Sequence, residues 1–419
     1  MTKLRVGILG AGAGGLTLAK YLNTYPNVEV ELFEKDNRVG GRCLSEPIDG
    51  HIVEYGTCYA IRAHRDALKW MKELKLETRR ITKQKMDGAK LMDFVKSGTG
   101  PAFLYQAAKY VLLRRRLMKG VEAGKTAALA EASKSILQWL SEHNLGKVER
   151  LMYRVVTVLG YGFLNEVSTL QAMRWVDFDM FVTGLLDFTF MPVLGWQHFW
   201  DKLAEGMTVH LEHQAVRVDR SNPRRPAVTF ADGTTATFDV LVSSLPVHQF
   251  AKIADATELE QEVAAGVNWG GYAMSLMSAR EWFKDEDIQT WSDTSGRVNE
   301  YGRVFVARRE IESADFNGML YAIGQRVGDY SGAELEEILM SETIARGAVE
   351  PKLIRQKIWL YFPEYDREAV KAGLPVKMKA MQGHSNVYFT GAMFSHEAVS
   401  SICKFNRPLA EQIARQSPK

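Results

Sequence analysis

Short apolar runs near the start of the chain predict two strands with a helix between them. Residues 4–9 form a nearly continuous apolar run, which is typical of a strand buried on both faces of a parallel sheet. Residues 28–33 alternate between apolar and acidic positions and end in Leu-Phe, as a second strand would. Residues 16–23 have the spacing of an amphipathic helix. The pattern therefore predicts a β-α-β unit at the N-terminus.

The middle of the chain returns to a strand-like pattern. Residues 207–246 contain several short β-rich runs. Two of these runs flank Asp232-Gly233, a pair that favours a tight hairpin turn. The last run, residues 239–246, is largely apolar and stops at a proline, so it predicts a buried strand.

The C-terminal part combines a last strand with a helix. Residues 386–392 predict the strand and a turn. We expect the helix to begin at about Glu397, with Ser395 as its N-cap. Residues 64–140, by contrast, have a mainly helical pattern, with few glycines or prolines after Pro101. Strand-rich and helix-rich stretches thus alternate along the chain.

A glycine motif lies between the first strand and the first helix. Gly10, Gly12 and Gly15 form the spacing Gly-x-Gly-x-x-Gly, and Glu34 ends the second strand nineteen residues later. Gly10 permits a tight turn, Gly12 lets the backbone approach a pyrophosphate, and Gly15 lets the helix pack on the strand. The helix N-terminus offers free N–H groups to phosphates, and Glu34 is placed to accept hydrogen bonds from ribose hydroxyls. This arrangement predicts a dinucleotide-binding site.

A second motif narrows the dinucleotide to FAD. Gly40-Gly41-Arg42 follows Glu34 after five residues. The two motifs together resemble the flavin amine oxidase superfamily, which includes monoamine and polyamine oxidases, phytoene-desaturase-like enzymes and Rab GDP-dissociation inhibitors. In that superfamily the glycine pair and the arginine continue the wrap around the FAD pyrophosphate. The resemblance implies non-covalently bound FAD.

Further stretches match the same superfamily. The resemblance implies that Glu54-Tyr55-Gly56-Thr57 approaches the flavin ring, that Val216 contacts adenine through its backbone, and that the C-terminal helix points its positive end at the flavin pyrimidine ring. The cofactor-binding residues implied in this way are Gly10, Gly12, Ala13, Gly14, Gly15, Glu34, Lys35, Gly40, Gly41, Arg42, Gly56, Thr57, Val216, Gly391, Ala392 and Val399.

The alternation of stretches indicates that two domains interleave within an α/β fold. We expect a discontinuous, Rossmann-like FAD-binding domain over residues 1–75, 200–255 and 375–419. Residues 76–199 and 256–374 are expected to form a substrate and helical cap domain with a mixed sheet and helices, as in the amine oxidases and GDP-dissociation inhibitors.

Three departures separate the chain from simple amine oxidases. Amine oxidases of this fold usually place a lysine near flavin N5, where the matching position here is Met274. Residues 393–397 replace the Trp-Ser-Gly-Tyr-like run that supplies one wall of an aromatic cage. Ala392 replaces the usual acid after the last glycine. The first two differences argue against amine oxidation, and the third removes one hydrogen-bond acceptor for the cofactor.

A closer resemblance is to the bacterial polyenoic fatty acid (linoleate) double-bond isomerases. It implies that flavin N5 abstracts a hydride from a bis-allylic carbon and returns it at another carbon, with no side-chain catalyst. The matching stretches are residues 159–163, 239–242, 359–363, 371–373 and 381–383.

The isomerase resemblance also suggests substrate contacts. An arginine that pairs with the fatty-acid carboxylate falls near Arg79-Arg80, although both are equally explained as surface charges. Leu159 replaces an aromatic residue of the isomerase, which puts the identity of the substrate in question. Tyr361 could line the pocket or belong to the core, and His396 could contact the substrate or simply lie at the start of a helix. The full set of substrate candidates is Arg80, Leu159, Tyr161, Met274, Tyr361 and His396.

Composition and charge exclude several other classes. With 46% hydrophobic and 25% charged residues the chain is globular, and its net charge of +3 is weak for a nucleic-acid binder. Three cysteines are too few for a disulfide framework, and the scattered histidines suggest no metal site. We find no signal peptide and no apolar run long enough for a transmembrane helix, so we expect a cytoplasmic location.

Residues 103–119 predict a helix with a basic C-terminal end. Phe103, Ala107, Tyr110 and Arg114 fall near one helical face. Such a helix either lies on a membrane surface and draws lipid substrates from it, or covers the substrate domain with its arginines complementing the helix dipole. The sequence leaves both open, as it does the oligomeric state.

Three hypotheses of function follow. The first is an FAD enzyme that abstracts a hydride from an apolar, carboxylated, unsaturated substrate. The second is an oxidase or desaturase of the same superfamily acting on a small metabolite. The third is a non-enzymatic lipid-binding module like the GDP-dissociation inhibitors, although the retained Glu34 and Gly40-Gly41-Arg42 argue against it.

Overall fold

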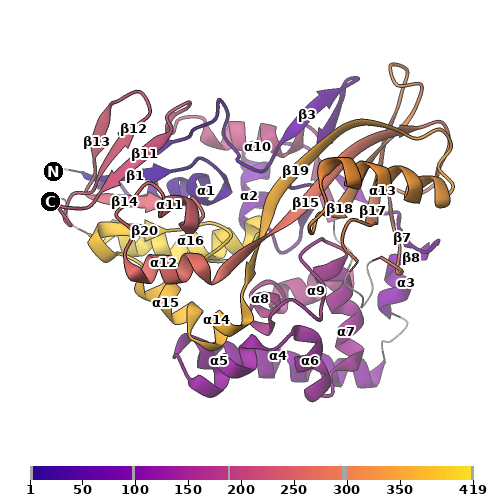
Figure 1. Ribbon diagram of the computed structural model, residues 1–419, viewed down its shortest axis with the longest axis horizontal. Coiled ribbons are helices and arrows are strands. Elements are labelled where there is room, and N and C mark those ends of the chain that lie inside the picture. The colour runs from indigo at the N-terminus through magenta and orange to yellow at the C-terminus, as the bar shows by residue number, and fades with distance from the viewer. Residues whose placement is uncertain (1–2, 97–99, 187–188, 295–299, 417–419) are drawn as a thin grey trace.

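The computed structural model describes residues 3–96, 100–186, 189–294 and 300–416 (Figure 1). A five-stranded parallel sheet forms one end of the molecule. Its strands are short and largely apolar, and both predicted N-terminal strands belong to it. In spatial order the strands are β10 (Thr208–His210), β2 (Val28–Phe33), β1 (Leu4–Leu9), β14 (Val240–Ser243) and β20 (Val387–Phe389).

Four helices in the described part of the chain cover one face of this sheet. The apolar face of the helix after β1 packs against the C-terminal helix, and an asparagine of the latter, Asn406, donates a hydrogen bond to the carbonyl of Gly14 at 2.8 Å. The C-terminal helix begins later than expected, and its N-cap is Ala398 without a side-chain cap bond. The expectation that Ser395 is the N-cap is therefore wrong, because its hydroxyl donates back to the carbonyl of Gly391 at 3.0 Å. These helices are α1 (Ala13–Leu22), α2 (Arg65–Glu73), α10 (Gly195–Ala204) and α16 (Val399–Ala414).

A small antiparallel sheet lies beside the parallel one. The predicted hairpin at Asp232-Gly233 is present, with Gly233 at φ +85°. The second helix after this hairpin has a capping box, in which the side chains of Thr257 and Glu260 each accept the other residue's backbone N–H. The elements here are β11 (Ala215–Asp219), β12 (Ala227–Phe230), β13 (Thr235–Thr237), α11 (Val247–Phe250) and α12 (Glu258–Ala265).

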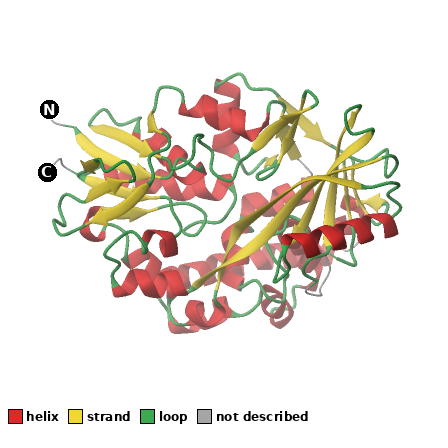
Figure 2. Cartoon of the chain, turned by 45° about the horizontal axis from the view of Figure 1, so that its top comes forward, coloured by secondary structure: helices red, strands yellow, loops and turns green. Residues whose placement is uncertain are grey.

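A seven-stranded mixed sheet forms the other end of the molecule (Figure 2). Its two longest strands pair along most of their length and reach from this end toward the parallel sheet (Figure 1). One helix, α13 (Gly332–Ala345), packs on the sheet. In order the strands are β19 (Lys352–Tyr365), β15 (Val267–Ala279), β18 (Gly318–Arg326), β17 (Val304–Ser313), β16 (Ile288–Thr290), β7 (Gln84–Met86) and β8 (Ala89–Lys90).

The remaining strands form two small antiparallel sheets. They interrupt the stretch 64–140, which was expected to be mainly helical: residues 78–90 form short strands because they pair with distant segments. One sheet joins β3 (Ser45–Ile48) to β4 (His51–Glu54), and the other has the order β5 (Ala60–Ile61), β9 (Thr189–Pro192), β6 (Thr78–Ile81).

A helical layer lies along the lower edge of Figure 1. Its core is aromatic: Tyr110 stacks on Phe181 at 5.6 Å between ring centroids and meets Trp139 edge-on at 6.3 Å. The layer comprises α3 (Leu91–Lys96), α4 (Pro101–Glu122), α5 (Thr126–Ser133), α6 (Ile136–Glu142), α7 (Gly146–Met152), the π-helical turn η1 (Tyr153–Thr157), α8 (Thr169–Trp175) and α9 (Phe178–Leu186), with α14 (Arg367–Lys371), α15 (Leu374–Ala380) and the 3₁₀ turn η2 (His384–Asn386) beside it.

The architecture agrees with the predicted fold class. The strands of the parallel sheet come from residues 4–33, 208–243 and 387–389. The stretches of chain between these residues form most of the mixed sheet and the helical layer. The fold is thus α/β, with a Rossmann-like unit interleaved with a mixed sheet and helices.

Candidate functional site

A groove runs along the carboxyl ends of the parallel strands, where open α/β sheets bind their ligands. The turn after β1, the end of β2 and the turn after β20 all contribute to it. Thirteen of the predicted cofactor-binding residues line this groove: Gly10, Gly12, Ala13, Gly14, Glu34, Lys35, Gly40, Gly41, Arg42, Thr57, Gly391, Ala392 and Val399.

Glycines bring three backbone segments together in the groove. A Cβ on Gly41 would lie 3.1 Å from the Cα of Gly12, and a Cβ on Gly14 would lie 3.0 Å from the Cα of Gly391. Gly41 also adopts φ +57°, which favours glycine. Bare backbone therefore faces the space in front of the α1 N-terminus, as a pyrophosphate requires. The groove fits FAD in this respect.

Glu34 is held in place by backbone amides. One of its oxygens accepts the N–H of Ala11 at 2.8 Å, and the other accepts the N–H of Asp36 at 3.1 Å. A carboxylate has about four lone-pair positions, so two remain for further donors. Because Glu34 also lines the groove, it is placed to receive the ribose hydroxyls of a dinucleotide.

The three other predicted cofactor residues lie outside the groove lining. A Cβ on Gly15 would lie 2.0 Å from the carbonyl oxygen of Gly10, so this glycine serves the packing of α1 on β1. A Cβ on Gly56 would lie 1.7 Å from the carbonyl oxygen of Arg42. Val216 lies on β11 with 43% of its surface exposed and lines neither the groove nor the cavity beside it.

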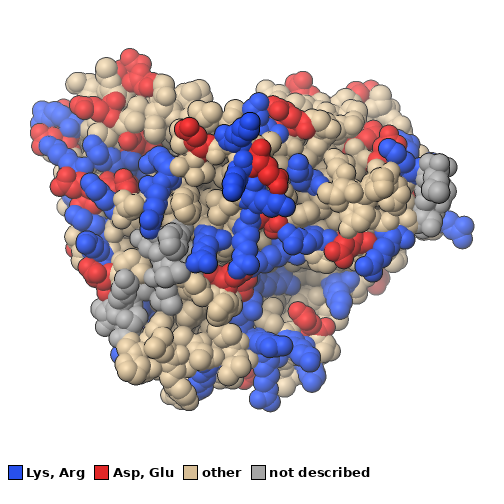
Figure 3. Space-filling model, turned by 180° about the vertical axis from the view of Figure 1, so that it is seen from behind, with Lys and Arg blue, Asp and Glu red and all other residues tan. Residues whose placement is uncertain are grey.

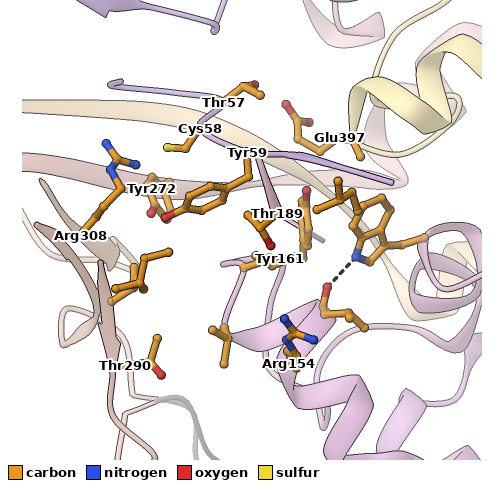
Figure 4. A pocket seen from close by; sticks show the side chains of 18 of the residues that line it. Thr57, Cys58, Tyr59, Arg154, Tyr161, Thr189, Tyr272, Thr290, Arg308 and Glu397 are labelled. Carbon is orange, nitrogen blue, oxygen red and sulfur yellow. Dashed lines mark hydrogen bonds between the residues drawn. The ribbon is translucent and has the colours of Figure 1, made fainter. Parts of the chain in front are cut away.

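An apolar cavity adjoins the groove (Figure 4). Its walls include η1, parts of α8, α9 and α16, and strands such as β15, β17 and β19, and several aromatic rings contribute to them. The ring of Tyr161 meets that of Phe362 edge-on at 5.2 Å, and Tyr272 meets Phe362 at 5.8 Å. Thr57, Glu397 and Val399 line both the groove and the cavity, so the two spaces meet at these residues.

The predicted substrate residues divide into two groups. Leu159, Tyr161 and Met274 line the cavity. His396 lies behind its wall, where its ring stacks on Trp175 at 4.9 Å and meets Tyr161 edge-on at 4.6 Å. Burial lowers the pKa of His396 to about 3, so the ring is neutral at physiological pH.

The remaining two candidates lie elsewhere. Arg80 is exposed on β6 and does not line the cavity. Tyr361 is the extra residue of a bulge in β19, since Gly270 pairs with Phe362 and Gly271 with Leu360. The side chain of Tyr361 lies outside the described part of the structure.

Two buried arginines that the sequence did not single out line the cavity. The Nε of Arg308 donates to Glu310 at 2.5 Å, and the other oxygen of Glu310 bonds His51 at 3.0 Å. The Nη2 of Arg308 is buried without a hydrogen-bond partner among the described residues. Arg154, on η1, donates through Nη1 to the sulfur of Met92 at 3.0 Å. One signal was present: Arg308 and Glu310 are two residues apart, on the same side of their strand as the apolar Val306.

A third charged residue lies at the junction of the two spaces. Glu397 accepts a hydrogen bond from Nη1 of Arg42 at 3.1 Å, and the Arg42 guanidinium lies 5.0 Å from the centre of the Trp269 ring. Burial raises the pKa of Glu397 to about 7, and the charge of Arg42 opposes that rise. In Figure 4, Thr57 and Glu397 lie along one edge of the cavity, whereas Thr290 and Arg154 lie on the opposite side.

No metal centre is found in the described residues, where no three His, Cys, Asp or Glu side chains come together in a way that would hold an ion. The three cysteines, Cys43, Cys58 and Cys403, are free and buried.

Comparisons with solved structures support the fold. A CLA-producing fatty acid isomerase from P. acnes superposes with a TM-score of 0.81 at 19% identity, covering 98% of both chains. Putrescine oxidase bound to putrescine gives 0.72 at 15% identity over 99% of both chains. Cyclohexylamine oxidase from Brevibacterium oxydans IH-35A gives 0.70 at 16% identity, covering 98% of this chain and 99% of the other.

Comparisons of sequence identify the family. The chain is 46% identical to coproporphyrinogen III oxidase of Staphylococcus aureus (strain NCTC 8325 / PS 47) over 57 residues, which cover 13% of this chain and only 12% of that relative. Residues 13–343 match the model of the flavin-containing amine oxidoreductases. The chain therefore belongs to the flavin-containing amine oxidoreductase family, whose members are FAD-dependent enzymes.

Proposed function

We propose that this enzyme acts on an apolar, unsaturated substrate that carries a carboxylate, and that it is a double-bond isomerase of polyunsaturated fatty acids. The observation that carries the proposal is the apolar cavity, which meets the FAD groove at Thr57, Glu397 and Val399 and has two buried arginines in its lining. The similarity to the P. acnes fatty acid isomerase supports it.

The charges in the cavity favour an anionic substrate over an amine. Arg154 and Arg308 are both buried in its lining, and Met274 stands where amine oxidases of this fold usually place a lysine. A carboxylate can accept a hydrogen bond from Nη2 of Arg308, which Glu310 leaves unoccupied, whereas a protonated amine has no acceptor to offer this donor. This is why we place the isomerase ahead of an amine oxidase.

The residues of the cavity position the substrate and exclude water. FAD held by the residues of the groove would supply the two-electron chemistry. Tyr161, Tyr272 and Phe362 hold one another in edge-on contacts, which gives a fixed aromatic wall for an extended alkenyl chain. Hydride chemistry of this kind needs positioning and dryness more than an acid or base.

The decisive test is incubation of the purified flavoprotein with linoleate, with and without oxygen. We expect formation of a conjugated diene, followed by its ultraviolet absorbance, at equal rates in air and under nitrogen. Diene formation without oxygen consumption supports an isomerase. Stoichiometric hydrogen peroxide would overturn it in favour of an oxidase, and inertness toward all polyunsaturated acids would remove the fatty-acid substrate.

The same proposal assigns the carboxylate to Arg308, because its Nη2 is the buried donor that still lacks a partner. Replacing Arg308 and Glu310 together by methionine leaves no buried charge of this pair behind. We expect KM for the free acid to rise about tenfold or more, and KM for its methyl ester to stay constant. Arg80→Met is the control, since Arg80 lies outside the cavity lining.

Arg154→Met identifies the other possible anchor. A KM effect confined to this variant would move the carboxylate to the side of the cavity opposite Glu397 and leave the isomerase proposal intact. Equal KM changes for acid and ester in the Arg308/Glu310 variant would show altered packing rather than a lost anion contact.

A further inference from the structure

The outer face of α4 exposes large apolar side chains to solvent. Leu104, Tyr105 and Leu112 are 69%, 69% and 68% exposed, more than the other large hydrophobic residues in the described part of the chain. The opposite face is buried: Phe103 stacks on Phe181, and the hydroxyl of Tyr110 donates to the carbonyl of Val176 at 2.8 Å. The face that the sequence pattern picks out through Phe103 and Tyr110 is thus the inner one.

Basic side chains continue the same outer face. Positions 104, 108, 112, 115 and 119 follow the helical repeat, which places Arg115 and Lys119 in line with the apolar residues and Arg116 beside them. Arg115, Arg116 and Lys119 are exposed, and no ion pair is recorded for them within the described residues. The sequence of α4 has one acidic residue, Glu122, at its last position.

We propose that this outer face of α4 docks on an anionic lipid bilayer. Leu104, Tyr105 and Leu112 would enter the boundary between headgroups and acyl chains, and Arg115, Arg116 and Lys119 would contact lipid phosphates. An exposed helix with apolar residues in one half and unpaired cations in the other is complementary to such a surface. The contact is peripheral, because no helix in the described ranges has the length and apolar character to cross a membrane.

The position of α4 in the molecule suits this contact. The helix lies on the lower edge of Figure 1, away from the parallel sheet. The lower edge seen from behind in Figure 3 shows uncharged surface next to a group of Lys and Arg side chains. α4 packs on α7 and α8, and the turn η1 that continues α7 contributes Arg154 and Val155 to the cavity lining. Docking would therefore place the helical layer, rather than the FAD groove, against the lipid.

The test is co-sedimentation of the full-length flavoprotein with vesicles. We expect binding to phosphatidylcholine vesicles that contain about one third phosphatidylglycerol, and much weaker binding to pure phosphatidylcholine. Arg115→Glu with Arg116→Glu should weaken binding about tenfold or more, as should Leu104→Ser with Leu112→Ser. All four side chains are exposed or face solvent, so the thermal unfolding of both variants should match wild type.

The matched control reverses two charges elsewhere. Arg224→Glu with Arg225→Glu changes the net charge equally, on an exposed loop between β11 and β12 beside the parallel sheet. This variant should bind vesicles like wild type. If the control variant loses as much vesicle binding, the effect depends only on net charge and the proposal is overturned. Absence of wild-type binding to anionic vesicles would overturn it too. A dimer that Leu104→Ser with Leu112→Ser dissociates, without vesicle binding, would assign the face to a second copy.

Discussion

Glu397 is a carboxyl group in an unusual position, because it borders both the FAD groove and the apolar cavity. One oxygen accepts a hydrogen bond from Arg42, and the other is buried without a hydrogen-bond partner among the described residues. Its pKa of about 7 means that burial outweighs the attraction of the arginine. The charge at the junction therefore changes within the physiological range of pH.

This titration predicts a pH dependence of stability. In the unfolded chain Glu397 loses its proton near pH 4.5, whereas in the folded, FAD-free protein it keeps the proton to about pH 7. The contribution of Glu397 to the free energy of unfolding therefore falls as pH rises from 4.5 to 7 and is constant above. Glu397→Gln should remove this loss, so it should be stabilising by up to about 3 kcal/mol more at pH 8 than at pH 4.5.

Urea unfolding of the FAD-free protein at the two pH values measures this difference. Glu411→Gln is the control, since Glu411 lies on the same helix with its side chain half exposed and should follow wild type. A pH-independent effect of Glu397→Gln would mean that the carboxyl titrates at its ordinary pKa.

The sequence predicts single residues well only where their role is local. The glycines of the groove follow from spacing within short turns, and Gly12 and Gly41 meet as the motif implies. Arg308 and Glu397 escape such reasoning, because their burial depends on segments distant in sequence. The expectation for Arg80 came from the isomerase resemblance, which placed the arginine only near Arg79-Arg80, and a shift of one residue on a strand changes the face that a side chain occupies.

At the scale of elements, apolar patterns predict the strands of the parallel sheet, because most of these strands are buried and show this in their own sequences. The short strands β6, β7 and β8 are different: β6 pairs with β9, and β7 with β16, about a hundred residues or more away. Their sequences contain too little apolar pattern to signal these partners. Helix ends are likewise decided by nearby geometry, as Ser395 shows by bonding Gly391 rather than capping α16.

Capping makes a prediction for α13. Ser331 accepts the N–H of Glu334, and Glu334 in return accepts the N–H of Ser331 at 2.8 Å. Ser331→Ala should lower the free energy of unfolding by about 1 kcal/mol, because the N–H of Glu334 loses its acceptor and the Glu334 carboxylate loses the hydroxyl bonded to it. Ser341→Ala, at an exposed interior position of the same helix, should be neutral or slightly stabilising. Chemical denaturation of both variants distinguishes a cap effect from loss of any serine.

At the scale of the whole molecule, the FAD groove depends on parts of the chain that are far apart. It is lined by the turns after β1 and β20, by residues 244–246 after β14, and by Trp359 and Leu360 of β19. The sequence predicts this interleaving, because three strand-rich stretches of the parallel sheet are separated by stretches of a different pattern. It does not predict the cavity, whose walls belong to many elements that have no common motif.

Binding at such a composite site should stabilise the entire fold. FAD at about 100 times its Kd adds about 2.7 kcal/mol to the free energy of unfolding, provided that the unfolded chain does not bind it. Differential scanning calorimetry of FAD-free protein with increasing FAD should therefore show Tm rising with the logarithm of FAD concentration. Riboflavin, which lacks the pyrophosphate, should give a much smaller shift. A Tm independent of FAD would contradict the assigned groove.

The strands β15 and β19 contribute to both spaces. On β15, Trp269 lines the groove and Met274 the cavity, and on β19, Leu360 and Phe362 do the same. The thirteen residues of β15 span about 40 Å and pair with β19 along most of their length, with irregularities in the pairing at Gly270/Gly271 and Leu276/Met277. Paired strands of this length resist bending, so moving the two ends of the molecule apart would break backbone hydrogen bonds between β15 and β19. We therefore expect substrate exchange to depend on movement in the helical layer, with little change in the spacing between the groove and the cavity wall.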